Sequence, residues 1–76
     1  MTVPQARFSL HVGPEELLRY YRGRASMVAV TADDGSRLRF PAASLRPFVT
    51  REGVHGRFLI RFDENLRLVE LRRIGG

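Results

Sequence analysis

The sequence predicts a small α+β domain built mostly of antiparallel strands, and three observations lead to this class. Apolar and polar residues alternate in several short runs, as in strands that bury one face. One stretch has helical spacing between a helix-start signal and a glycine. The chain has only 76 residues, too few for two cores. We therefore expect a single domain over residues 7–74, preceded by a flexible tail at residues 1–6.

The first strand is predicted over residues 7–12, where apolar and polar side chains alternate without a break. Arg7, Ser9 and His11 would face outward in this strand. The inward positions would be filled by three apolar side chains, Phe8, Leu10 and Val12.

A helix is predicted over residues 14–22. Gly13 and Pro14, followed by two glutamates, form a favourable helix start, because negative charge stabilises a helix N-terminus. Gly23 supplies a stop that tolerates left-handed backbone. A helix this short is not stable alone, so we expect it to pack on the sheet. Four side chains are expected on or beside its packed face: Leu17, Leu18, Tyr20 and Tyr21.

The middle of the chain predicts a hairpin followed by an irregular cap. Extended patterns over residues 26–31 and 37–41 flank Asp34-Gly35, and Asp-Gly between such runs is a strong hairpin signal. Pro47 then restricts the residue before it and interrupts the pattern. We expect residues 41–49 to form an irregular or single-turn helical segment that closes one end of the core.

A second hairpin is predicted from residues 54 or 56 to 62, a turn at residues 63–65 and a last strand at residues 66–72. In its first strand Phe58, Ile60 and Phe62 would face inward, and Arg57, Leu59 and Arg61 outward. In its second strand simple alternation fails, which indicates either a β-bulge or two partly covered faces. The five strands would form a bent sheet or a small, partly open barrel with one helix.

Six segments of the sequence, at residues 8–10, 16–23, 34–35, 39–49, 56–58 and 62–65, can be compared with a known family. They resemble a small family of bacterial proteins known as domain of unknown function 2835, and the resemblance covers nearly the whole chain. The most particular segment is the stretch from Arg39 to Val49, which no generic strand or helix pattern requires. The resemblance implies a stand-alone bacterial protein. The family has no established activity, so the resemblance transfers no functional residues.

The residue types favour a protein that is not an enzyme and that uses no metal or cofactor. There is no cysteine, which excludes disulfides, thiolate nucleophiles and sulfur-ligated metals. His11 and His55 have no partner at metal-ligand spacing, and no serine lies in a recognisable nucleophile motif. The first ten residues lack the features of a secretory signal, and no apolar run could span a membrane. We therefore expect a cytoplasmic protein.

Arginine is the most unusual feature of the composition. The formal net charge is +5 and all 13 basic residues are arginine. Arg37, Arg39, Arg57 and Arg61 would lie on outward strand faces, where they could bind nucleic-acid phosphates if the faces converge. The ordinary interpretation is that exposed strand positions need polar side chains and that nearby carboxylates offset the charge.

A protein-interaction surface is the preferred alternative to nucleic-acid binding. An open sheet leaves an edge strand that can pair with a second copy or with a partner, and the irregular apolar pattern of the last strand favours such pairing. The sequence therefore predicts a non-catalytic interaction or self-associating domain. The candidate contact residues are Leu45, Phe48, Leu68, Val69 and Leu71.

Overall fold

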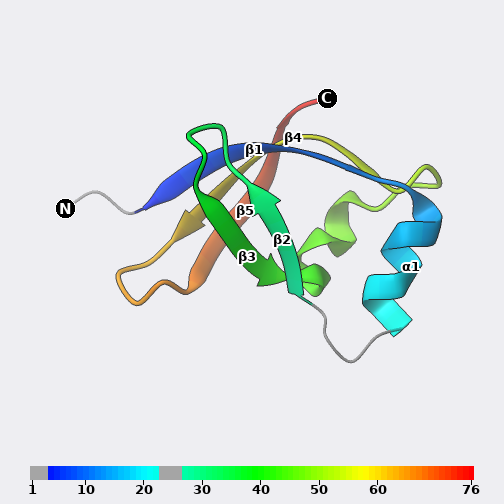
Figure 1. The fold of residues 1–76 in the computed structure, drawn as a ribbon, viewed down its shortest axis with the longest axis horizontal. Coiled ribbons are helices and arrows are strands. Elements are labelled where there is room, and N and C mark those ends of the chain that lie inside the picture. The colour runs from blue at the N-terminus through cyan, green and yellow to red at the C-terminus, as the bar shows by residue number, and fades with distance from the viewer. Residues whose placement is uncertain (1–3, 23–26) are drawn as a thin grey trace.

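The computed structural model describes residues 4–22 and 27–76, except for the side chains of residues 20–22. This part of the chain contains one α-helix, one 3₁₀ helix and five strands, which confirms the predicted α+β class (Figure 1). In order they are β1 (Gln5–Val12), α1 (Pro14–Arg22), β2 (Met27–Thr31), β3 (Arg37–Pro41), η1 (Ala42–Phe48), β4 (Val54–Phe62) and β5 (Leu68–Gly75).

The strands form two antiparallel sheets. The larger sheet has the order β1-β4-β5, and the smaller is the hairpin β2-β3. Both hairpins predicted from the sequence, β2-β3 and β4-β5, are present. The first strand pairs with the fourth, so that Phe8 lies opposite Phe58 and Val12 opposite Val54. Of the two predicted architectures, the described strands adopt the open, bent one and do not close into a barrel.

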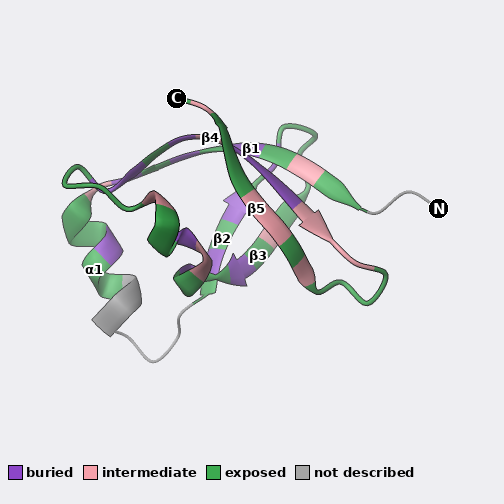
Figure 2. Ribbon diagram, turned by 180° about the vertical axis from the view of Figure 1, so that it is seen from behind, coloured by how far each residue is buried: buried purple, intermediate pink, exposed green. Residues whose placement is uncertain are grey.

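The β2-β3 hairpin covers the inner face of the three-stranded sheet. The two figures, taken from opposite sides, show the hairpin in front of β5 in one view and behind it in the other (Figures 1 and 2). At the hairpin tip the backbone N–H of Asp33 donates a hydrogen bond to the carbonyl oxygen of Arg7 at 2.8 Å. The tip is therefore joined to the free edge of β1.

The core between the sheets is dominated by phenylalanine. The ring centroid of Phe8 lies 5.7 Å from that of Phe40 and 5.7 Å from that of Phe58, and all three side chains are fully buried. Phe48 of η1 packs edge-on against Phe58 at 5.2 Å. Full burial of a phenylalanine side chain contributes about 1.5–3 kcal/mol, so Phe8, Phe40 and Phe58 together stabilise the fold by several kcal/mol. The inward positions predicted for β1 and β4 are thereby confirmed. Leu59, for which the sequence predicts an exposed outward position, is instead buried at 5% exposure, because β4 is the central strand and has β1 and β5 on either side.

Helix α1 differs from the expectation in its packing. It begins where predicted, and Leu17 N–H donates to the Gly13 carbonyl at 3.0 Å as the first helical bond. Leu17 is buried, but Leu18 is 47% exposed. The helix lies at one end of the sheets beside η1 and does not cross a sheet face (Figure 1), so only a narrow stripe is covered. The predictions for the side chains of Tyr20 and Tyr21, and for Gly23, fall outside the part of the chain that the structure describes.

The ends of two strands differ from the sequence prediction. Strand β1 begins at Gln5, inside the expected tail, because residues 5 and 6 pair with β4 and the Phe62 N–H donates to the Pro4 carbonyl at 2.9 Å. Strand β5 begins two residues late, because the Asp63 carboxylate accepts hydrogen bonds from the backbone N–H groups of Asn65 and Arg67 and prolongs the turn. Leu66 in this turn has a φ of 62°.

Strand β5 contains the irregularity that its sequence indicates. Two register shifts interrupt its pairing with β4 and leave Val69 and Ile74 without a partner residue. The register shift at Val69 allows Leu68 and Leu71 both to pack against the core although they are three residues apart. Of the two alternatives left open by the sequence, a bulge is therefore present.

Candidate functional site

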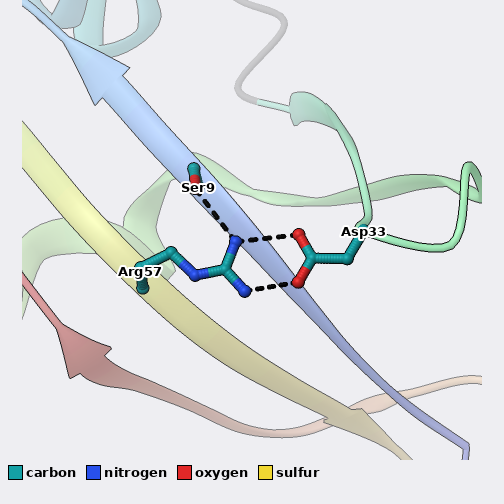
Figure 3. Close-up of polar contacts among 3 residues, drawn as sticks. All are labelled: Ser9, Asp33 and Arg57. Atoms are coloured by element: carbon teal, nitrogen blue, oxygen red, sulfur yellow. Dashed lines mark hydrogen bonds and ion pairs between the residues drawn. The ribbon is translucent and has the colours of Figure 1, made fainter.

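The best-defined polar contact on the surface joins Arg57 to Asp33 across strand β1 (Figure 3). The Arg57 guanidinium donates to both carboxylate oxygens of Asp33, with Nη1–Oδ1 at 2.8 Å and a second, shorter bond from Nη2 to Oδ2. The same Nη1 donates to the Ser9 hydroxyl at 3.0 Å. This bidentate arrangement is the strongest that arginine forms with a carboxylate.

The environment of Asp33 stabilises its ionised form. The hydrogen bonds from Arg57 lower the pKa of Asp33 below its ordinary value, and the charges of Arg57 and Arg7 act in the same direction. The guanidinium of Arg57 is engaged by this carboxylate, so a phosphate would have to displace Asp33 in order to bind there. Both side chains are exposed, at 39% and 52%, so the pair is accessible to competing ions.

Arg61 lies on the same outer face in a second charged group. Its Nε is 3.6 Å from an Oε1 of Glu70 on β5, and the Nε of Arg72 is 3.9 Å from that oxygen. At 3.6 Å the contact is an ion pair and not a hydrogen bond, and the buried Nε of Arg61 has no hydrogen-bond partner. Glu70 thus offsets part of the charge of two arginines.

Arg37 and Arg39 lie on strand β3 of the other sheet, opposite Thr31 and Ala29, and both are exposed. Neither forms an ion pair with a carboxylate in the described part of the chain. Because the inner faces of the two sheets share one core, their outer faces point away from each other. The four predicted phosphate-binding arginines therefore occupy two opposite surfaces and do not form one stripe.

The predicted contact residues are mostly internal. Leu45 of η1 is fully buried. This contradicts its expected place on a contact surface, because the 3₁₀ helix turns this side chain into the core. Phe48, Leu68 and Leu71 are partly buried and pack against the same core. Only Val69 is largely accessible, at 52%.

Comparison with known proteins identifies the family. The model of the family described as Protein of unknown function (DUF2835) matches residues 4–74. The chain belongs to this family. The match begins in the residue before β1 and ends within β5, so the DUF2835 region includes both sheets and the helix.

The family assignment confirms the resemblance seen in the sequence and adds no activity. No curated protein and no solved structure matches this DUF2835 chain. Within residues 4–22 and 27–76 no helix has the length and apolar character needed to cross a membrane. The same residues contain no group of three or more His, Asp or Glu side chains arranged to hold a metal.

One polar contact of the DUF2835 chain was missed by sequence reasoning. His11 of β1 and His55 of β4 lie directly opposite each other on the outer face of the sheet, with their Nδ1 atoms 3.4 Å apart. Ligand spacing along a helix does not reveal this pair, because the two histidines are separated by 44 positions. The signal available was the pairing of Phe8 with Phe58, which places residue 11 opposite residue 55 in an antiparallel register.

Proposed function

We propose that this chain is a non-catalytic cytoplasmic domain that associates with itself through the free edge of β5. The observation that carries the proposal is the character of this edge. β5 pairs with β4 on one side only, and Val69 and Ile74 on it are 52% and 42% exposed. Leu66, just before the strand, is 75% exposed. Exposed edges with apolar side chains favour pairing with another strand.

The charges of β5 support one particular register. Residue pairs along two antiparallel strands alternate between hydrogen-bonded and non-hydrogen-bonded pairs. A two-fold axis preserves this alternation only if one residue of β5 lies opposite the same residue of the second copy. A centre at Glu70 or Arg72 would place like charges opposite each other. A centre at Leu71 places Glu70 opposite Arg72 of the second copy twice, within the stretch of β5 between its two register shifts. Pairing in this register would join two three-stranded sheets into a continuous one.

Charge reversal tests the register. Glu70→Arg and Arg72→Glu each place like charges opposite each other at two symmetric positions, and we expect each to weaken the dimer at least about tenfold. The double variant Glu70→Arg/Arg72→Glu restores opposite charges and should recover the dimer. Light scattering coupled to size exclusion, over a range of protein concentrations, measures the dissociation constant.

Arg37→Glu is the matched control for Arg72→Glu, because it makes the same change of charge on the other sheet and should leave the dimer intact. Circular dichroism confirms that each variant is folded. Bulges and charges also protect edges in proteins that remain monomeric. A wild-type protein that is monomeric at millimolar concentration, or a double variant that does not recover, rules the proposal out.

Binding of nucleic acid is the second candidate, and Arg37 and Arg39 are the observation that favours it. They are exposed two residues apart on β3 and have no carboxylate partner in the described residues. We expect Arg37→Ala/Arg39→Ala to reduce the slope of log affinity against log salt concentration by the equivalent of about two phosphate contacts. Arg57→Ala/Arg61→Ala should reduce this slope less. Fluorescence anisotropy with single- and double-stranded DNA measures this. Absence of binding at low salt excludes the candidate.

A further inference from the structure

The contact between His11 and His55 has the dimensions of a metal chelate. Two nitrogen atoms that bind one Zn²⁺ at about 2.0–2.1 Å with a tetrahedral angle lie about 3.3–3.4 Å apart. The Nδ1 atoms of the two histidines are 3.4 Å apart, and the ring centroids are 5.6 Å apart. Both side chains are exposed, so a metal ion and its water ligands can reach the two nitrogens.

A hydrogen bond made by Nε2 of His55 leaves Nδ1 of the same ring available to bind a metal ion. Its Nε2 lies 2.7 Å from the backbone carbonyl oxygen of Glu52, which can only accept, so Nε2 carries the proton. In a neutral imidazole Nδ1 then has a free lone pair directed at His11. Metal-bound histidines typically donate their second N–H to a carbonyl or carboxylate in this way, which sets the tautomer and the ring orientation.

The carbonyl that orients His55 belongs to a tightly held turn. Thr50 and Gly53 exchange backbone hydrogen bonds of 2.8 and 3.0 Å, and the Thr50 hydroxyl accepts from the Glu52 N–H at 3.2 Å. Gly53 is buried and packs so closely on the Val12 carbonyl of β1 that no Cβ would fit. The turn is thus held against the end of the same strand that carries His11, and the geometry of the pair exists before any ligand binds.

We propose that His11 and His55 form a site for a divalent first-row transition-metal ion. The two Nδ1 atoms bind the metal and water occupies its remaining positions. Binding uses both Nδ1 lone pairs, so the proton that His11 Nδ1 otherwise donates to His55 Nδ1 moves to Nε2 of His11. Imidazole ligands favour Cu²⁺, Ni²⁺ and Zn²⁺ over Mg²⁺, and affinity falls on acidification because protons compete for the same nitrogens.

Isothermal titration of tag-free full-length protein with Zn²⁺, Ni²⁺ or Cu²⁺ measures the affinity. Altering the second-sphere partner of a metal ligand costs about 10–100-fold in affinity, so we expect loss of a ligand in His11→Ala or His55→Ala to weaken binding at least about tenfold. Glu52→Gln is the control, because it removes a nearby carboxylate and keeps the carbonyl that holds His55, and its affinity should match the wild type. Mg²⁺ should not bind.

Long-range ¹H–¹⁵N spectra provide a readout that does not depend on affinity. On addition of Zn²⁺ the Nδ1 resonances of both histidines should shift, while His55 Nε2 keeps its proton. Binding that is unchanged in either alanine variant, a metal on Nε2, or no binding of the three metals at millimolar concentration would show that the pair is only an imidazole–imidazole hydrogen bond.

Discussion

At the scale of single residues, the outer face of the large sheet is organised by the contact between Arg57 and Asp33. Each residue alone has an ordinary interpretation, an exposed strand position and a turn carboxylate. The structure brings them together because the β2-β3 tip is hydrogen bonded to β1, which places Asp33 above the strand next to Arg57. The contact therefore joins the two sheets by side chains at the point where their backbones already meet.

The pH dependence of this contact follows from the lowered pKa of Asp33. A carboxyl whose pKa is lower in the folded than in the unfolded protein stabilises the fold at pH values above its pKa in the unfolded protein. This contribution is lost as the pH falls through the pKa of the folded protein. We expect Arg57→Gln to raise the pKa of Asp33 toward its ordinary value, as measured by carboxyl-detected NMR titration.

Asp34 is the internal control for this titration. The pKa of Asp34 is lowered by its hydrogen bonds with Ser36, and one of these is a backbone bond of 2.9 Å. Arg57→Gln should therefore leave the pKa of Asp34 unchanged. An equal change at both carboxyls would indicate a general loss of positive charge and would contradict a specific bond between Arg57 and Asp33.

At the scale of elements, the turn at Thr50–Gly53 determines how β1, η1 and β4 meet. It connects the end of η1 to the start of β4, and its glycine packs against the last residue of β1. Gly53 has a φ of 98°, a conformation that an L side chain adopts only at a cost. Both space and backbone geometry therefore require glycine at this position.

We expect Gly53→Ala to destabilise the fold strongly, because the new methyl group would meet the Val12 carbonyl oxygen in addition to the backbone strain. Gly35→Ala is the matched comparison, since Gly35 has a φ of 90° and open space around it. Strain alone costs about 1–2 kcal/mol, so the variant at Gly35 should lose about this much and the variant at Gly53 clearly more. Urea unfolding measures both, and equal losses would refute the steric argument.

The elements that the sequence predicted well are those set by neighbouring residues. The two hairpins need only an Asp-Gly or an Asp-Glu-Asn turn between extended runs, and the bounds predicted for α1 and β3 agree with the structure. The start of β5 was missed because the Asp63 side chain prolongs the turn. The spacing of Leu18 predicts a position on the packed face of α1, because spacing alone cannot show that α1 lies beside η1.

At the scale of the whole molecule, the pairing of β1 with β4 decides which surfaces exist, and no local pattern reveals it. This pairing brings His11 opposite His55 and Ser9 opposite Arg57. The packing of the β2-β3 hairpin on the resulting sheet then separates Arg37 and Arg39 from Arg57 and Arg61. A list of outward-facing arginines could be read from the sequence, but their distribution over two opposite surfaces depends on contacts between distant segments.

The same long-range pairing limits when the protein can fold during its synthesis. Phe8 is made early, yet its partner Phe58 follows 50 positions later along the chain, which a ribosome adds in roughly 3–10 s at ~5–20 residues per second. Until β4 emerges, the apolar face of β1 has no sheet to join. Phe8, Leu10 and Val12 of the nascent chain therefore stay without their partner strand until residues 54–62 have left the exit tunnel, and only then can the core assemble.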